Sequence, residues 1–202
     1  MYRWLSAVFA KETDTKALAV YRSDGHFLDE LSPRPEFKAA VDTIRKSLEQ
    51  DLDLDDLAIE LASEFSYLFL GVGGSHAAPP YESAYVSESG ALYQDSTVQT
   101  ERVLERYGLN VRPDIPEPAD HIAFQLELMA VMAEREETIS DDTLALRMLR
   151  AEQKDFLENH LMNWVPKFSR DCSAGSPGGF YDGIARLTSK ILEEDHAYLS
   201  ED

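Results

Sequence analysis

Apolar residues recur along this chain at intervals of three and four, the spacing that places side chains on one face of an α-helix. The strongest such face comprises Leu57, Leu61, Phe65, Leu68 and Phe69. A second comprises Phe37, Val41, Ile44 and Leu48. No stretch alternates apolar and polar residues over the length of a strand. The pattern therefore predicts an all-α fold: a single globular bundle of about eight to ten helices without a sheet.

Polar, glycine-rich and proline-rich segments mark the predicted helix boundaries. The acidic residues 51–56 supply N-cap and first-turn carboxylates to the helix that carries Leu57. Gly108 occupies the expected C′ position of a helix over 98–107. Near the N-terminus we expect one helix over 4–9 and another from Thr15, interrupted around Gly25. The final third predicts helices over 141–161, 164–168 and 180–199, with a loop over 173–179.

Two proline-rich segments are long for connections inside a compact helical bundle. Residues 79–85 read Pro-Pro-Tyr-Glu-Ser-Ala-Tyr, and the two tyrosines could stack on a docked partner. Residues 112–121 read Arg-Pro-Asp-Ile-Pro-Glu-Pro-Ala-Asp-His and open an apolar helix. We expect residues 1–202 to form one domain. An alternative division gives lobes 1–111 and 119–202, joined by the connector 112–118.

The net charge of the chain favours some classes of binding partner over others. The 202 residues include 38 acidic and 19 basic side chains, a formal net charge of −19 at pH 7. The basic residues are scattered singly among acids, which disfavours nucleic acid and anionic membrane surfaces as partners. An acidic surface attracts cationic partners, although solubility alone explains such a charge equally well.

The cysteine content and the N-terminus indicate a compartment. Cys172 is the only cysteine, so the chain forms no internal disulfide and no cysteine-rich metal site. Residues 1–6 contain one basic residue, and no long apolar run follows them. We therefore expect neither a signal peptide nor direct membrane insertion, and a cytoplasmic location.

Motifs of enzymatic sites are incomplete. Glycines 71–74 lack the Lys-Ser or Lys-Thr of a phosphate loop, and His76 stands where a dinucleotide fingerprint requires glycine. Glu193-x-x-His196 occurs once, whereas a carboxylate-bridged metal pair uses two such elements. Asp120 and His121 are the one polar pair suited to acid–base work, but a role at a helix N-terminus explains them more simply. We expect no catalytic residue, no metal and no cofactor.

Several separated segments resemble the TorD/DmsD/NarJ family of molybdoenzyme chaperones. Residues 2–12 are similar to the family's first helix, 65–71 to the helix end before its first signature loop, and 79–85 to that loop. Residues 117–121 are similar to the second signature, Glu-Pro-x-Asp-His, in full. The TorD-like branch is indicated by His160-Leu161, Trp164, Phe168 and Phe180-Tyr181. The likeness keeps the family's order over almost the whole chain.

The resemblance implies a cytoplasmic chaperone without enzymatic activity. It would bind the twin-arginine signal peptide and the apo form of a molybdenum-cofactor-containing reductase, assist cofactor insertion and delay export. The implied peptide-binding residues are apolar walls, rigid prolines and polar contacts: Phe65, Leu68, Phe69, Pro80, Tyr81, Glu82, Tyr85, Glu117, Pro118, Asp120 and His121. The first three lie on an apolar helix face and could equally be core.

Three alternatives remain open at this point. Guanine nucleotide binding has been proposed within the family, so a GTP-responsive switch or weak nucleotide hydrolase is one. An adaptor for some other basic peptide is another. The connector 112–118 could also act as a hinge for exchange of helices, which would give a homodimer.

Overall fold

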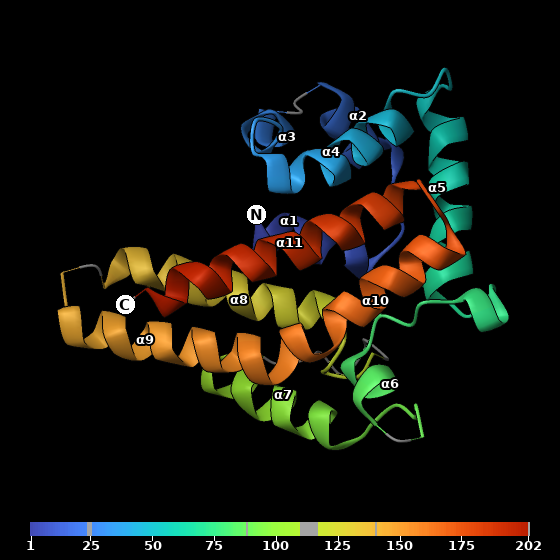
Figure 1. Cartoon of the computed structure of the whole chain (residues 1–202). Coiled ribbons are helices and arrows are strands. Elements are labelled where there is room, and N and C mark those ends of the chain that lie inside the picture. Colours follow the sequence, from blue (N-terminus) through green and yellow to red (C-terminus); the bar gives the residue numbers. More distant parts are fainter. Residues whose placement is uncertain (24–25, 88, 110–116, 140, 202) are drawn as a thin grey trace. The chain divides into compact units, whose positions relative to one another are not determined.

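The computed structural model describes residues 1–23, 26–87, 89–109, 117–139 and 141–201, and most of these are helical (Figure 1). No β-strand occurs among them. The predicted all-α class, with close to the expected number of helices, is therefore confirmed. The helices are α1 (Tyr2–Ala10), α2 (Thr15–Ser23), α3 (His26–Leu31), α4 (Pro35–Leu48), α5 (Leu54–Phe69), α6 (Glu82–Val86), α7 (Asp95–Arg106), α8 (Ile122–Thr138), α9 (Thr143–Phe156), α10 (Met162–Gly175) and α11 (Phe180–Ser200), with a 3₁₀ turn η1 (Gly74–His76) and a π-helical turn η2 (Leu157–Leu161).

The chain forms two compact units, each built from segments distant in the sequence. Unit 1 comprises Met1–Ala10, Pro80–Val165 and Leu192–Asp202, and unit 2 comprises Lys11–Pro79 and Pro166–Ile191. Helices α10 and α11 each run from one unit into the other. Residues 112–116 of the predicted connector 112–118, and the interruption expected around Gly25, lie outside the described residues. The alternative division at that connector stays a prediction.

In unit 1, the short helix α1 packs on α8. Leu5, Val8 and Phe9 are fully buried, and the Ser6 hydroxyl donates to the Ala123 carbonyl at 2.8 Å. On the polar side of α1, Arg3 forms ion pairs with two glutamates of α8. The nine-residue helix α1 thus buries an apolar face against α8 and forms ion pairs beside it.

In unit 2, aromatic rings fill the centre. Phe65 and Phe69 of α5 meet edge to face, with ring centroids 5.0 Å apart. Phe69 also stacks on Phe168 at 5.8 Å and meets Tyr181 at 5.2 Å. Such pairs contribute about 0.5–1.5 kcal/mol beyond their area burial. The face that the sequence predicted for α5 is therefore the core of this unit.

Helix α5 begins where the acidic turn predicted it. The Asp53 side chain accepts from the backbone N–H groups of Asp55 and Asp56, at 3.0 and 2.9 Å. This N-cap satisfies two donors that the first turn leaves without a helical partner. Asp55 and Asp56 add negative charge where the helix dipole is positive.

The final third differs from the prediction. Helices α9 and α10 are joined by η2 without a loop, and α10 continues to Gly175, so the break after 161 and the loop from 173 were wrong. Pro166 lies inside α10 and cannot donate a backbone hydrogen bond. The π turn η2 lies directly before α10 and ends at Leu161, and such turns interrupt the α-helical hydrogen-bond pattern. The apolar pattern does not reveal that adjustment.

The close approach of α10 to η1 gives a testable consequence. A Cβ atom on Gly175 would stand 2.4 Å from the His76 carbonyl oxygen and 2.8 Å from a Leu68 methyl carbon. Gly175→Ala is therefore expected to lower the free energy of unfolding by about 1–3 kcal/mol, measured by urea denaturation. Ala174→Ser, at the exposed neighbouring position, is the control; equal effects of the two changes would contradict the packing argument.

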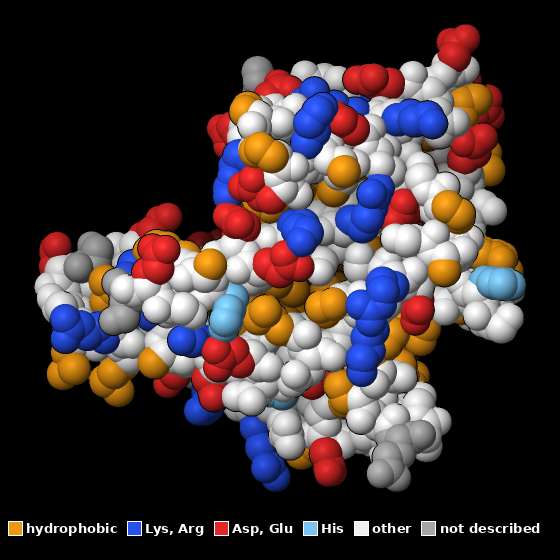
Figure 2. All heavy atoms as spheres, in the orientation of Figure 1, with side chains coloured by type: hydrophobic (Ala, Val, Ile, Leu, Met, Phe, Trp, Pro, Cys, Tyr) orange, Lys and Arg blue, Asp and Glu red, His pale blue; other side chains and the backbone are white. Residues whose placement is uncertain are grey.

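The surface of the described chain is strongly charged but mixed in sign. Acidic and basic side chains are interspersed on the face shown in Figure 2. Several form exposed pairs, such as Lys38 with Asp42 at 2.9 Å, which contribute little to stability. Within the described ranges, no helix combines the length and apolar character needed to cross a bilayer.

Candidate functional site

The two proline-rich segments meet in unit 1. The Ile122 N–H donates to the Pro80 carbonyl at 2.9 Å, and the Glu82 N–H donates to the Asp120 carbonyl at 3.1 Å. These bonds form an antiparallel bridge between Tyr81 and His121. Segments almost forty residues apart in the sequence are thereby fixed side by side. We call residues 80–85 and 117–121 the paired loops.

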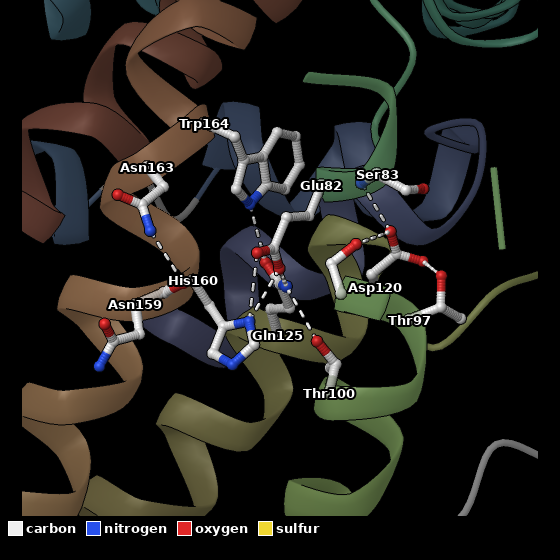
Figure 3. Close-up of polar contacts among 11 residues, drawn as sticks. Glu82, Ser83, Thr97, Thr100, Asp120, Gln125, Asn159, His160, Asn163 and Trp164 are labelled. Carbon is white, nitrogen blue, oxygen red and sulfur yellow. Dashed lines mark hydrogen bonds and ion pairs between the residues drawn. The ribbon is translucent and has the colours of Figure 1, made fainter. Parts of the chain in front are cut away.

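Asp120 holds the paired loops together from inside. It is fully buried, and its carboxylate accepts from the Ser83 N–H at 2.7 Å and from the Thr97 hydroxyl at 2.8 Å (Figure 3). The Ser96 hydroxyl adds a longer contact at 3.4 Å. Asp120 thus stabilises the start of α6 and ties it to α7, whereas the sequence suggested a role at the helix that follows Asp120 itself.

His121 caps that following helix, α8. Its Nδ1 accepts from the Ala123 N–H at 3.1 Å. Burial lowers the pKa of His121 to about 4, against the opposing effects of Glu117 and Asp120. The imidazole is therefore neutral at pH 7 and retains the lone pair that the cap requires.

Tyr81 and Glu117 form the half-buried edge of the paired loops. The Tyr81 hydroxyl donates to the Glu117 carboxylate at 2.5 Å, and its ring meets the His121 imidazole edge to face at 5.1 Å. Partial burial and the neighbouring Glu117 carboxylate raise the pKa of Tyr81 above its usual value, so the phenol stays a hydrogen-bond donor. An aromatic ring and a carboxylate are thus presented together.

Behind this edge, Glu82 is the centre of a buried polar network. Its carboxylate accepts from Gln125 Nε2 at 2.5 Å and from His160 Nδ1 at 2.9 Å (Figure 3). A carboxylate only accepts, so His160 carries a proton on Nδ1. Gln125 in turn accepts from the Trp164 indole N–H at 3.0 Å and reaches the Thr100 hydroxyl at 3.3 Å. The network with Glu82 at its centre thus joins α6, α7, α8, η2 and α10.

The structure brings eight of the eleven predicted site residues together in the paired loops. Pro80 and Pro118 are buried and shape the backbone, and Tyr85 lies half-buried with its ring 5.5 Å from Trp164. Phe65, Leu68 and Phe69 belong to unit 2, where they are at most 6% exposed. Glu82, Asp120 and His121, expected as polar contacts to a partner, are engaged in internal hydrogen bonds. Whether any of the eleven touches a peptide stays a prediction.

Sequence reasoning missed the residues that hold Glu82 and Asp120. Gln125 interrupts the apolar face of α8, and Thr97 and Thr100 lie one turn apart on α7. A polar residue within an apolar face signals a buried hydrogen bond, and that signal was present at Gln125. His160 was noticed only for its place in a family pattern.

The acids of the paired loops are engaged in hydrogen bonds within the protein. The buried carboxylates are occupied by two or more donors each, and Glu117 accepts from Tyr81. The described residues contain no group of three or more histidines, cysteines or acids placed to hold a metal ion. His196, from the single Glu-x-x-His element, contacts Glu158 at 2.7 Å.

Comparison with known proteins identifies relatives over the whole chain. Residues 33–170 match the family model described as nitrate reductase delta subunit. The chain is 34% identical to the chaperone protein TorD of Vibrio parahaemolyticus, covering 98% of this chain and 93% of that protein. It is 33% identical to the TorD of Vibrio atlanticus, covering 99% and 93%. A redox enzyme maturation protein from Archaeoglobus fulgidus has the same fold, with a TM-score of 0.51 and 21% identity over 96% of this chain and 94% of that one.

Proposed function

We propose, because this chain belongs to the TorD/NarJ family of molybdoenzyme chaperones, that it binds the twin-arginine signal peptide and the apo form of a molybdenum-cofactor-containing reductase. In this proposal it acts in the cytoplasm, assists cofactor insertion and delays export. It performs no bond chemistry, in keeping with relatives that are named chaperones. The family indicated by the residues is confirmed; its client and ligand are what we propose.

The paired loops carry this proposal. A twin-arginine leader has a basic start followed by an apolar stretch. Its arginines match a carboxylate acceptor, because charge-assisted hydrogen bonds between guanidinium and carboxylate are strong. Its apolar stretch matches an aromatic surface. The edge formed by Tyr81 and Glu117, with Tyr85 beside it, offers both features on a backbone fixed by two hydrogen bonds.

The buried members of the predicted site have a supporting role in this proposal. Glu82, Asp120 and His121 are each at most 6% exposed. They fix the paired loops before a partner arrives, which reduces the ordering cost of binding. We therefore assign direct contact to Tyr81, Tyr85 and Glu117.

A synthetic twin-arginine leader peptide tests the assignment. Tyr81→Ala and Glu117→Gln are each expected to weaken its affinity by about 5- to 20-fold in calorimetric titration, since each removes one member of the exposed edge. Affinity should also fall as salt increases. Glu137→Gln, the same charge change at an exposed position of α8, and Tyr67→Ala in unit 2 are the controls.

Circular dichroism of each variant should match the parent protein, so that lost affinity is not lost folding. If both edge variants bind the leader as the parent does, the paired loops are not its site. Retained affinity for a leader with both arginines replaced by glutamine would reject the charge argument.

A further inference from the structure

A groove lined by α7 and by the α9–η2 segment lies in unit 1. Two adjoining cavities, of about 250 and 750 Å³, share Val103, Arg106, Asp155 and His160. A third, of about 330 Å³, shares Arg106 and Glu152 with the smaller one and extends towards Ile139 and Met148. None of the paired-loop residues lines these cavities, so the groove is a separate surface.

His160 connects this groove to the buried network. Its side chain is 8% exposed to solvent, and its ring stacks on Phe156 with centroids 4.7 Å apart. Nδ1 is held by Glu82, and the second ring nitrogen points away from that carboxylate (Figure 3). No hydrogen bond to Nε2 occurs within the described chain. A ring fixed on one side by a carboxylate presents its other nitrogen in a defined direction.

Cationic side chains gather along the same groove. Arg102 and Arg106 lie one helical turn apart on α7, and Arg135 lines the end near Ile139. None of the three forms an ion pair with a carboxylate of the described residues. Elsewhere in unit 1, Arg3 and Arg150 are both paired with glutamates.

The acids that line the groove are partly occupied. Glu152 accepts from the Tyr107 hydroxyl, and Asp155 accepts from the Asn159 amide at 2.8 Å. Glu105 is exposed at the rim. In a chain of net charge −19, the groove is therefore a place where guanidinium groups are available to an anion.

We propose that this groove binds an acidic peptide segment of a partner protein, whose carboxylate is received by Arg102 and Arg106, while His160 Nε2 accepts a backbone N–H of the same segment. Guanidinium donors suit a carboxylate. A histidine ring that donates from Nδ1 offers its other nitrogen as an acceptor, which suits a peptide N–H. The side-chain amides of Gln99 and Asn159 suit a peptide backbone, and the apolar end at Ile139 and Met148 suits a neighbouring aliphatic side chain. The site is independent of the signal-peptide proposal, since a cationic leader has the opposite charge.

Two blocked pentapeptides, Ala-Leu-Glu-Leu-Ala and Ala-Leu-Gln-Leu-Ala, test this in nuclear magnetic resonance titrations of the full chain. The glutamate peptide is expected to shift the His160 ring nitrogens and the α7 amides, and the glutamine peptide to bind at least about tenfold more weakly. The double variant R102Q/R106Q should also bind the glutamate peptide at least about tenfold more weakly. Arg147→Gln removes an exposed arginine of α9 outside the groove and should change affinity by less than about twofold.

Equal binding of the two peptides would overturn the proposal, as would an equal loss in R147Q. So would the absence of any shift at about 10 mM peptide. Inorganic phosphate is the third probe: saturation by phosphate at the same residues, without binding of the glutamate peptide, would identify a small-anion site instead. Leader affinity measured in R102Q/R106Q should equal that of the parent, so failure here is distinguishable from failure at the paired loops.

Discussion

Glu82→Ala is expected to lower the free energy of unfolding by about 2–5 kcal/mol, because it removes the acceptor that two buried hydrogen-bond donors share. The change leaves His160 Nδ1 and Gln125 Nε2 without the carboxylate that accepts from both. His160 Nδ1 then lacks an acceptor, and Gln125 Nε2 keeps only its longer contact with the Thr100 hydroxyl at 3.3 Å. Urea denaturation followed by far-ultraviolet circular dichroism measures the loss.

Two control variants test whether the loss of stability comes from the buried network or merely from shortening a glutamate side chain. Glu137→Ala, at an exposed position of the neighbouring helix α8, should change stability by no more than about 0.5 kcal/mol. Glu82→Ala combined with His160→Ala should cost less than the sum of the single changes, since the two side chains interact directly. Additive effects, or a Glu82→Ala cost below about 1 kcal/mol, would show that the pair is not coupled as the geometry indicates.

The stability of the parent protein is expected to fall as pH decreases, in part because of His121. The folded-state pKa of this residue is about 4, below the ordinary value of 6.5. The unfolded chain therefore binds the proton first, so this contribution to stability is full above about pH 6.5 and declines towards about pH 4. By about pH 5 the decline due to His121 amounts to about 2 kcal/mol.

His121→Asn isolates this contribution, because asparagine can cap α8 but does not titrate. The free energy of unfolding of the variant should fall less steeply between about pH 7.5 and about pH 5 than that of the parent. His76→Asn, on the exposed turn η1, should follow the parent profile. Parallel profiles for the parent and His121→Asn would mean that His121 is not held neutral by burial.

The helices and loops of this chain could be predicted from local sequence patterns, whereas the burial of Glu82 and Asp120 could not. The face of α5, the Asp53 cap and the end of α7 at Gly108 each depend on residues within a few positions, and each was predicted. Residues 79–85 and 117–121 also stood out by their composition, and their part in binding stays a prediction. These features are local in origin.

Features that depend on residues distant in the sequence could not be predicted in this way. Glu82 is buried because Gln125 and His160, 43 and 78 positions later, supply its hydrogen bonds. Nothing adjacent to Glu82 distinguishes it from an acid facing solvent. The π turn at 157–161 likewise arises from packing, since it places Leu157, His160 and Leu161 on the buried side together.

The interleaving of the two units has a consequence for biosynthesis. Helix α1 is made more than a hundred residues before α8, the helix on which it packs, and a further segment of unit 1 follows after residue 191. No contiguous stretch of the chain contains unit 1 without unit 2. A nascent chain that stops before residue 191 therefore completes neither unit. Unit 1 can therefore reach its finished arrangement only after the C-terminal part of α11 has emerged from the ribosome.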